Sequence, residues 1–351
     1  MARYMRTSAA AIICPRRVRS GAVALVLSLL ALAALGAAPA LAKWGPPRAI
    51  NPTSGSTFDP AAVSCASTTF CAAVDFSGLA STWNGSAWSV PVSIDSSGAP
   101  VISVSCPTAG FCVAVDQTGN EITYSAGKWA APVQIDTTHG LFHVSCASSS
   151  FCVAIDSESA LVFKGGSWSA PIPLHPASFL ASVSCPSSSF CMAVGGSGDA
   201  FRYNGSSWRP APPNGVNAGQ VSCSSASFCE VVGFLSTATW TGDAWSAPIN
   251  VLSDPLWSFS DVSCTSSSFC MATAAFAAGI NDITAGAIYR WNGKSWDSSG
   301  NNSHALNSVS CVSSSYCIAV DNHGRYMKYF VGTGARMASR RVAHSPRLRR
   351  A

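Results

Sequence analysis

The sequence has few of the residues on which hydrolytic enzymes depend. Charged residues make up 11% of its 351 residues, and only Glu121, Glu158 and Glu230 are glutamates. The arginines between residues 43 and 335 are scattered, and no serine lies in a Gly-x-Ser-x-Gly motif. The sequence therefore has no arginine cluster of the sialidase kind, no recognisable pair of catalytic carboxylates and no nucleophile elbow.

Basic residues are also scarce in the middle of the chain, although the formal net charge is +5. Five of the 21 Lys and Arg residues precede residue 20 and six follow residue 335, which leaves 10 basic against 16 acidic residues over residues 43–335. A basic groove for nucleic acid is therefore excluded there. Residues 333–351 are expected to be a disordered basic tail, with adhesion to anionic cell-surface polymer as the functional alternative.

Residues 1–42 are predicted to be a secretory signal peptide. Arginines precede an apolar stretch at residues 22–38, and the small-residue sequence Ala40-Leu41-Ala42 follows, after which cleavage is expected. The apolar stretch is near the lower length limit for a membrane span, so an uncleaved anchor is the alternative. We expect a secreted or envelope-associated extracellular protein, with no membrane span after cleavage.

Cysteine is abundant and regularly spaced. Seven times a Val-Ser-Cys triplet is followed, after four residues, by Phe or Tyr and a second cysteine, at intervals of 38 to 47 residues. The pairs are Cys65 and Cys71, Cys106 and Cys112, Cys146 and Cys152, Cys185 and Cys191, Cys223 and Cys229, Cys264 and Cys270, and Cys311 and Cys317. Such cysteines can face each other across a hairpin with Cα atoms about 4.5 to 5.5 Å apart. We predict seven disulfides and no metal or cofactor, because the spacing does not match zinc ligands.

Each repeat contains four segments of strand character. The first ends in Val-Ser-Cys, and the second, as at residues 111–116, is apolar on both faces and suits a strand packed between neighbours. The third ends in an aromatic residue before a turn such as Asn84-Gly85, which favours a hairpin. The fourth begins with Trp and usually carries Pro three residues later, which marks a sheet edge. Aromatic pairs such as Trp83 and Trp88 are expected to face each other across the hairpin and to pack between sheets rather than bind sugar.

The two ends of the repeat region complement each other. The last unit lacks the Trp-Pro strand, whereas residues 44–50 form such a strand with no unit before it. Four antiparallel strands repeated seven times predict an all-β, seven-bladed β-propeller over residues 43–332, in which the N-terminal strand completes the last blade. Over residues 44–332 the sequence resembles the secreted bacterial β-propellers of the WD-repeat, kelch and BNR-like superfamily, and this resemblance implies the fold but no particular activity.

Aspartates end the second strand of four units, at Asp75, Asp116, Asp156 and Asp321. In propellers the loops leaving the second strands share a face with the loops entering the next blade, and ligands usually bind there. One interpretation is that these carboxylates accept hydrogen bonds from the turns that follow. The functional alternative is an acidic arc that holds a cation or sugar hydroxyls.

Other candidate residues map to the same face. The histidines of the repeat region, including His143 and His323, are expected in its loops. An insertion in the sixth unit, centred on residues 276–282, is expected to form an apolar patch or plug with Leu256, Trp257 and Phe259 of a neighbouring loop. The predicted ligand-binding set is therefore the four aspartates with His323, Trp257 and Phe276.

The sequence favours an exported, monomeric binding module or scaffold without catalysis. Its expected partner is a polysaccharide or an envelope or extracellular protein, with no nucleic acid. The alternative is a carbohydrate-active enzyme, a sialidase-like or other glycosidase or lyase, that uses the aspartates of the loop face.

Overall fold

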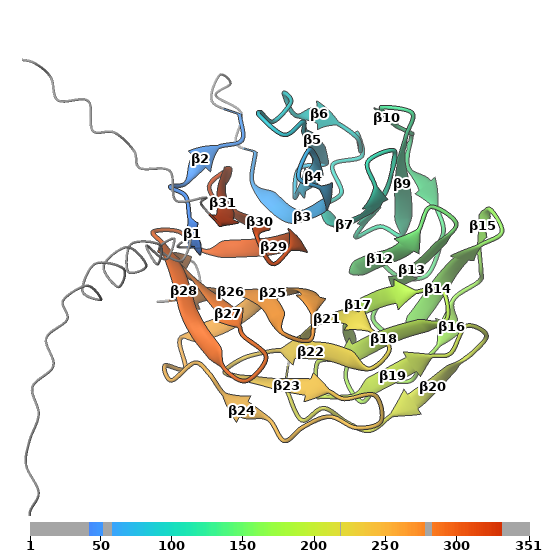
Figure 1. Cartoon of the computed structure of the whole chain (residues 1–351). Helices are drawn as coiled ribbons and strands as arrows, with labels where there is room; N and C mark the ends of the chain where they lie inside the picture. The colour runs from blue at the N-terminus through green and yellow to red at the C-terminus, as the bar shows by residue number, and fades with distance from the viewer. Residues whose placement is uncertain (1–41, 52–57, 218, 278–282, 332–351) are drawn as a thin grey trace, which may run out of the picture. The chain divides into compact units, whose positions relative to one another are not determined.

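The computed structural model describes residues 42–51, 58–217, 219–277 and 283–331. Its strands form seven antiparallel sheets, the blades, arranged in a ring around a central hub (Figure 1). The first strands of neighbouring blades contact each other all the way round, including those of the seventh and first blades. The all-β, seven-bladed propeller predicted from the repeat is thus confirmed. In the described part of the chain, no helix is long and apolar enough to cross a membrane.

The inner three strands of each blade follow the predicted order. The first strands, at the hub, are β3 (Pro60–Ser67), β7 (Val101–Thr108), β12 (His143–Ser148), β17 (Leu180–Ser187), β21 (Gln220–Ser225), β25 (Trp257–Ser266) and β29 (Leu306–Ser313). The second strands are β4 (Phe70–Asp75), β8 (Phe111–Asp116), β13 (Phe151–Ile155), β18 (Phe190–Gly195), β22 (Phe228–Val232), β26 (Phe269–Ala277) and β30 (Tyr316–Asp321). The third strands are β5 (Leu79–Trp83), β9 (Asn120–Ser125), β14 (Ser159–Lys164), β19 (Ala200–Tyr203), β23 (Ser236–Trp240), β27 (Ile283–Trp291) and β31 (Arg325–Val331).

The fourth strands form the outer edges, and proline usually interrupts them. They are β6 (Val92–Ser93), β10 (Lys128–Trp129) with β11 (Val133–Gln134), β15 (Ser167–Trp168) with β16 (Ile172–Pro173), β20 (Trp208–Ala211), β24 (Ile249–Asn250), β28 (Trp296–Asn302), and β1 (Ala42–Trp44) with β2 (Arg48–Ala49). A proline residue cannot donate to the ladder, so these edges pair only in short pieces. The sixth blade has no proline there, and β28 runs unbroken for seven residues.

The ring is closed by the N-terminal residues, as predicted. Both β1 and β2 pair with β31, with Trp44 opposite Tyr329 and Arg48 opposite Tyr326. The rings of Trp44 and Tyr329 lie 5.4 Å apart between centroids. Strand β1 begins at Ala42, one residue before the predicted cleavage point, so cleavage there would leave Lys43 as its first residue.

Seven apolar clusters hold the blades together, one at each interface between neighbours. The second strands are buried on both faces. The predicted aromatic pairs lie across the hairpins between the third and fourth strands, as with Trp83 and Trp88, whose ring centroids are 5.7 Å apart. Trp83 is 2% exposed and packs with Ile318 and Tyr326 of the seventh blade. These aromatic residues therefore serve packing between sheets.

All seven predicted disulfides are present, each joining the first and second strands of one blade. Their Cα atoms lie 3.9 to 4.1 Å apart, closer than the predicted separation. Facing residues that do not exchange backbone hydrogen bonds approach more closely than those that do. The two cysteines of each pair do not exchange backbone hydrogen bonds, because the N–H of the first cysteine donates to a serine of another blade.

These N–H groups form a closed ring of hydrogen bonds with the serines of the Val-Ser-Cys triplets. Each first cysteine donates its backbone N–H to the serine Oγ of the preceding blade, at 2.9 Å in all seven cases. The link from Cys65 to Ser310 joins the first blade to the seventh. These seven serines therefore link neighbouring blades, a role that the sequence of one blade does not indicate.

The sixth blade differs from the prediction. Trp257 and Phe259 lie in strand β25 rather than in a loop, and Phe259 is only 6% exposed. The insertion partly lengthens the hairpin, because β26 and β27 have nine residues each. Residues 278–282 lie outside the described part of the chain.

Candidate functional site

A cavity of about 470 Å³ lies at the hub, bounded by the first strands of the seven blades. The residue three positions before the first cysteine has the same register in every blade, opposite the residue three positions after the second. Six of these residues line the cavity: Ala62, Ser103, His143, Gln220, Asp261 and Ser308. The repeat thus fixes the scaffold with constant Val, Ser and Cys, and places a variable side chain (Ala, Ser, His, Gln or Asp) at the hub.

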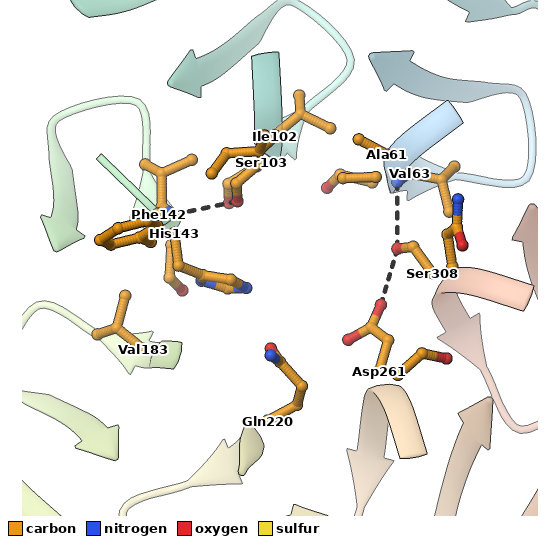
Figure 2. Close-up of a pocket in the computed structure, with 18 of the residues that line it drawn as sticks. Ala61, Val63, Ile102, Ser103, Phe142, His143, Val183, Gln220, Asp261 and Ser308 are labelled. Carbon is orange, nitrogen blue, oxygen red and sulfur yellow. Dashed lines mark hydrogen bonds between the residues drawn. The ribbon is translucent and has the colours of Figure 1, made fainter. Parts of the chain in front are cut away.

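A chain of hydrogen bonds spans three blades on one wall of the cavity (Figure 2). Asp261 Oδ2 accepts from Ser308 Oγ at 2.7 Å and from the Val309 N–H at 2.9 Å. Ser308 Oγ in turn accepts from the Val63 N–H at 3.2 Å. Enclosure at the hub raises the pKa of Asp261 to about 6, although these hydrogen bonds oppose the shift.

His143 and Gln220 project into the cavity from the other side (Figure 2). His143 Nδ1 is buried without a hydrogen-bond partner. Burial lowers the pKa of His143 to about 4, so its imidazole is neutral at pH 7. The cavity therefore offers amide, hydroxyl and neutral imidazole groups that can donate or accept hydrogen bonds, together with one carboxyl group.

An apolar pocket of about 290 Å³ adjoins the hub cavity, and we call it the phenylalanine groove. It is lined by Phe142, Ser157, Phe179, Leu180, Ala181 and Gln220. Phe142 and Gln220 also line the hub cavity. Phe142 is 39% exposed and Phe179 47%. Single exposed apolar residues are common on protein surfaces, whereas exposed aromatic side chains that line a pocket indicate a binding site.

Solved structures share this architecture. A structure of YCF48 bound to a D1 peptide has a TM-score of 0.63 and 14% identity, over 84% of this chain and 98% of the other. The WD40 repeats of RRP9 give a TM-score of 0.66 at 9% identity, over 82% and 97%. YCF48 from Cyanidioschyzon merolae gives 0.61 at 12% identity, over 82% and 99%. No family model and no curated protein matches this chain.

The chain shares the β-propeller fold with these proteins. At these identities the likeness concerns the fold alone, so any statement about a ligand of this propeller has to come from its own residues.

The four predicted aspartates cap turns of the propeller and do not line the hub cavity. Each is at most 1% exposed. Each Oδ1 accepts two backbone N–H groups of the following turn: Ser77 and Leu79 for Asp75, Thr118 and Asn120 for Asp116, Glu158 and Ser159 for Asp156, and His323 and Arg325 for Asp321. The interpretation as turn caps therefore accounts for one oxygen of each carboxylate. A ligand-binding role for the aspartates stays a prediction.

The remaining predicted site residues lie in two separate places. His323 stacks on His304, with ring centroids 3.8 Å apart. Trp257 and Phe276 face each other across strands β25 and β26, with ring centroids 5.4 Å apart. Neither pair lines the hub cavity or the phenylalanine groove.

Sequence reasoning missed the hub residues. His143 was expected in a loop but is the first residue of strand β12. Gln220, Asp261 and Ser308 were not singled out, although all occupy one repeat position. The signal that identifies them is variation at the position directly before the constant Val-Ser-Cys triplet, since a strand residue facing a shared axis is free of the packing that fixes the triplet.

Proposed function

We propose that this propeller is an exported, non-catalytic binding module that takes a polypeptide segment at the hub cavity and the phenylalanine groove. The observation that carries the proposal is their adjacency, because Phe142 and Gln220 line both. A bound segment would place backbone groups against the polar wall and one apolar side chain between Phe142 and Phe179.

A polypeptide suits a polar cavity beside an apolar groove better than a polysaccharide does. Peptide backbone presents donors and acceptors in equal number, which Ser103, Gln220 and Ser308 can match, while its side chains supply the apolar anchor. The propeller of YCF48 has been observed with a D1 peptide, which supports peptide binding as a use of the fold. Export agrees with seven cystines and with the predicted signal peptide.

The test is selection of a displayed random peptide library on the folded protein, followed by calorimetry with the selected peptides. We expect binding that the Phe142→Ser variant weakens at least about fivefold, because truncating an aromatic anchor typically costs more than about 1 kcal/mol. Ile249→Ala serves as the matched control, since Ile249 is 47% exposed on the outer edge strand β24. Its binding should stay within about twofold of the unsubstituted protein.

Three outcomes would overturn the proposal. The first is a library that yields no binder while soluble cell-wall glycans bind, which identifies a polysaccharide module. The second is equal affinity in the Phe142→Ser variant, which places the site elsewhere. The third is turnover of a glycoside that Asp75→Asn, Asp116→Asn, Asp156→Asn or Asp321→Asn abolishes, which supports an enzyme.

A further inference from the structure

Two buried carboxylates meet at the interface of the second and third blades. Asp136, which follows strand β11, is 1% exposed, and Asp156, which follows β13, is 0% exposed. Their Oδ1 atoms are engaged: that of Asp136 accepts from the N–H and hydroxyl of Thr138 at 2.8 and 2.7 Å, and that of Asp156 from the Ser159 N–H at 2.6 Å. Their Oδ2 atoms are buried and have no hydrogen-bond partner.

The unpaired oxygen of Asp156 contrasts with the equivalent aspartates of two other blades. Asp116 Oδ2 accepts from the Asn120 side chain at 2.7 Å, and Asp321 Oδ2 from Arg325 Nε at 2.9 Å. Both donors stand four residues after their aspartate. The turn of the third blade is one residue shorter, so the equivalent position is Ser159, whose N–H donates to Asp156 Oδ1. The side-chain donor that satisfies the second oxygen of Asp116 and Asp321 is therefore missing at Asp156, as it is at Asp75.

His139 completes a set of three ligand atoms. One imidazole nitrogen of His139 and one oxygen of each carboxylate lie within 4.8 Å of one another, and no other such group of three occurs among the described residues. The Nδ1 atom of His139 is 3.8 Å from Asp156 Oδ2. The His139 side chain is 44% exposed, so its ring has room to turn and leaves a path from solvent.

We propose that Asp136, His139 and Asp156 bind a divalent transition-metal ion, with Zn²⁺ as the best match. Two neighbouring buried carboxylates whose Oδ2 atoms have no donor need a positive charge or a proton between them. An imidazole beside them favours Zn²⁺ over Ca²⁺ and Mg²⁺, which prefer oxygen ligands only. Ligand atoms about 2.1 Å from a tetrahedral zinc lie roughly 3.4 Å apart. The three ligand atoms lie within 4.8 Å of one another, so they need to approach by at most about 1.4 Å. One coordination position would remain open to water.

The test is calorimetric titration of the metal-free protein, without any added histidine tag, with Zn²⁺, Ca²⁺ and Mg²⁺ in turn. We expect one Zn²⁺ per chain with a dissociation constant in the micromolar range or below, no comparable binding of Ca²⁺ or Mg²⁺, and a higher thermal unfolding temperature with Zn²⁺. Asp136→Asn, Asp156→Asn and His139→Ala should each weaken Zn²⁺ binding at least tenfold and remove the thermal shift.

Two control variants separate this site from others. Asp116→Asn changes the equivalent aspartate whose second oxygen already has a donor, and His323→Ala removes the exposed imidazole beside the half-buried His304 as a competing zinc site. Both should keep the affinity of the unsubstituted protein. The proposal fails if the unsubstituted protein binds no Zn²⁺ at 100-fold molar excess, which would mean that the carboxylates share a proton. It also fails if His323→Ala abolishes binding while Asp156→Asn does not.

Discussion

Reduction of the seven cystines is expected to abolish the cooperative unfolding transition at 25 °C. Each bridge closes a ring of seven residues, for which the chain-entropy estimate is about 2 kcal/mol. Seven such contributions approach or exceed the net stability of about 5 to 15 kcal/mol that a folded domain typically has. The second cysteine of each pair is fully buried, as with Cys71 and Cys317, so reduction should require unfolding first.

The measurement is circular dichroism during urea unfolding, on protein reduced in denaturant and returned to buffer with reductant. A variant lacking one pair, Cys311→Ala with Cys317→Ala, gives the single-bridge value and should lose roughly 2 kcal/mol plus a packing contribution. Reduced protein that unfolds cooperatively at the same urea concentration as the oxidised protein would show that the bridges contribute nothing to stability.

Substitution of Glu230 by Gln is expected to stabilise the protein at neutral pH but not in acid. Glu230 lies in strand β22 with no exposed surface, and its Oε1 accepts from Trp296 Nε1 of the next blade at 3.2 Å. Burial raises the pKa of Glu230 from 4.5 to about 7. The folded state therefore holds a proton that the unfolded state releases above pH 4.5, and this contribution to stability is lost as the pH rises through about 7.

The corresponding measurement is the free energy of unfolding by urea at pH 4 and pH 8. The advantage of Glu230→Gln over the unsubstituted protein should grow by on the order of 3 kcal/mol between these values. The titrating groups of the hub cavity, Asp261 and His143, are present in both proteins, so their contributions to the pH dependence cancel in the comparison. The control is Glu158→Gln, the same substitution at an exposed glutamate. A difference for Glu230→Gln that stays constant between pH 4 and pH 8 would contradict the pKa given above.

The scaffold follows from the sequence because its determinants are local and repeated seven times. Cysteine spacing within one hairpin, the Asn-Gly turns and the Trp-Pro edges each act over fewer than about ten residues, and their period implies the ring. The missing strand of the last unit and the extra strand at Trp44 then predict closure. Turn caps such as Asp75 are likewise local, and their structural interpretation was available from the sequence.

The hub could not be derived in the same way, because its residues become neighbours only through the ring. Ser310 binds Cys65, 245 positions away in the sequence, and nothing in either blade alone indicates this. Glu230 appears in an otherwise apolar strand with no motif, and its partner Trp296 belongs to another blade. The pairing of Asp136 with Asp156 across an interface is equally invisible without the relative positions of two blades.

Closure of the ring is tested most directly by hydrogen exchange at the seven first-cysteine amides. Six of them donate to the preceding blade along the chain, whereas Cys65 donates to Ser310 only if the first and seventh blades meet. We expect the Cys65 amide to exchange as slowly as the other six, within about tenfold, through global unfolding. Exchange of Cys65 and Val63 that is orders of magnitude faster than at the other blades would mean that the ring is open.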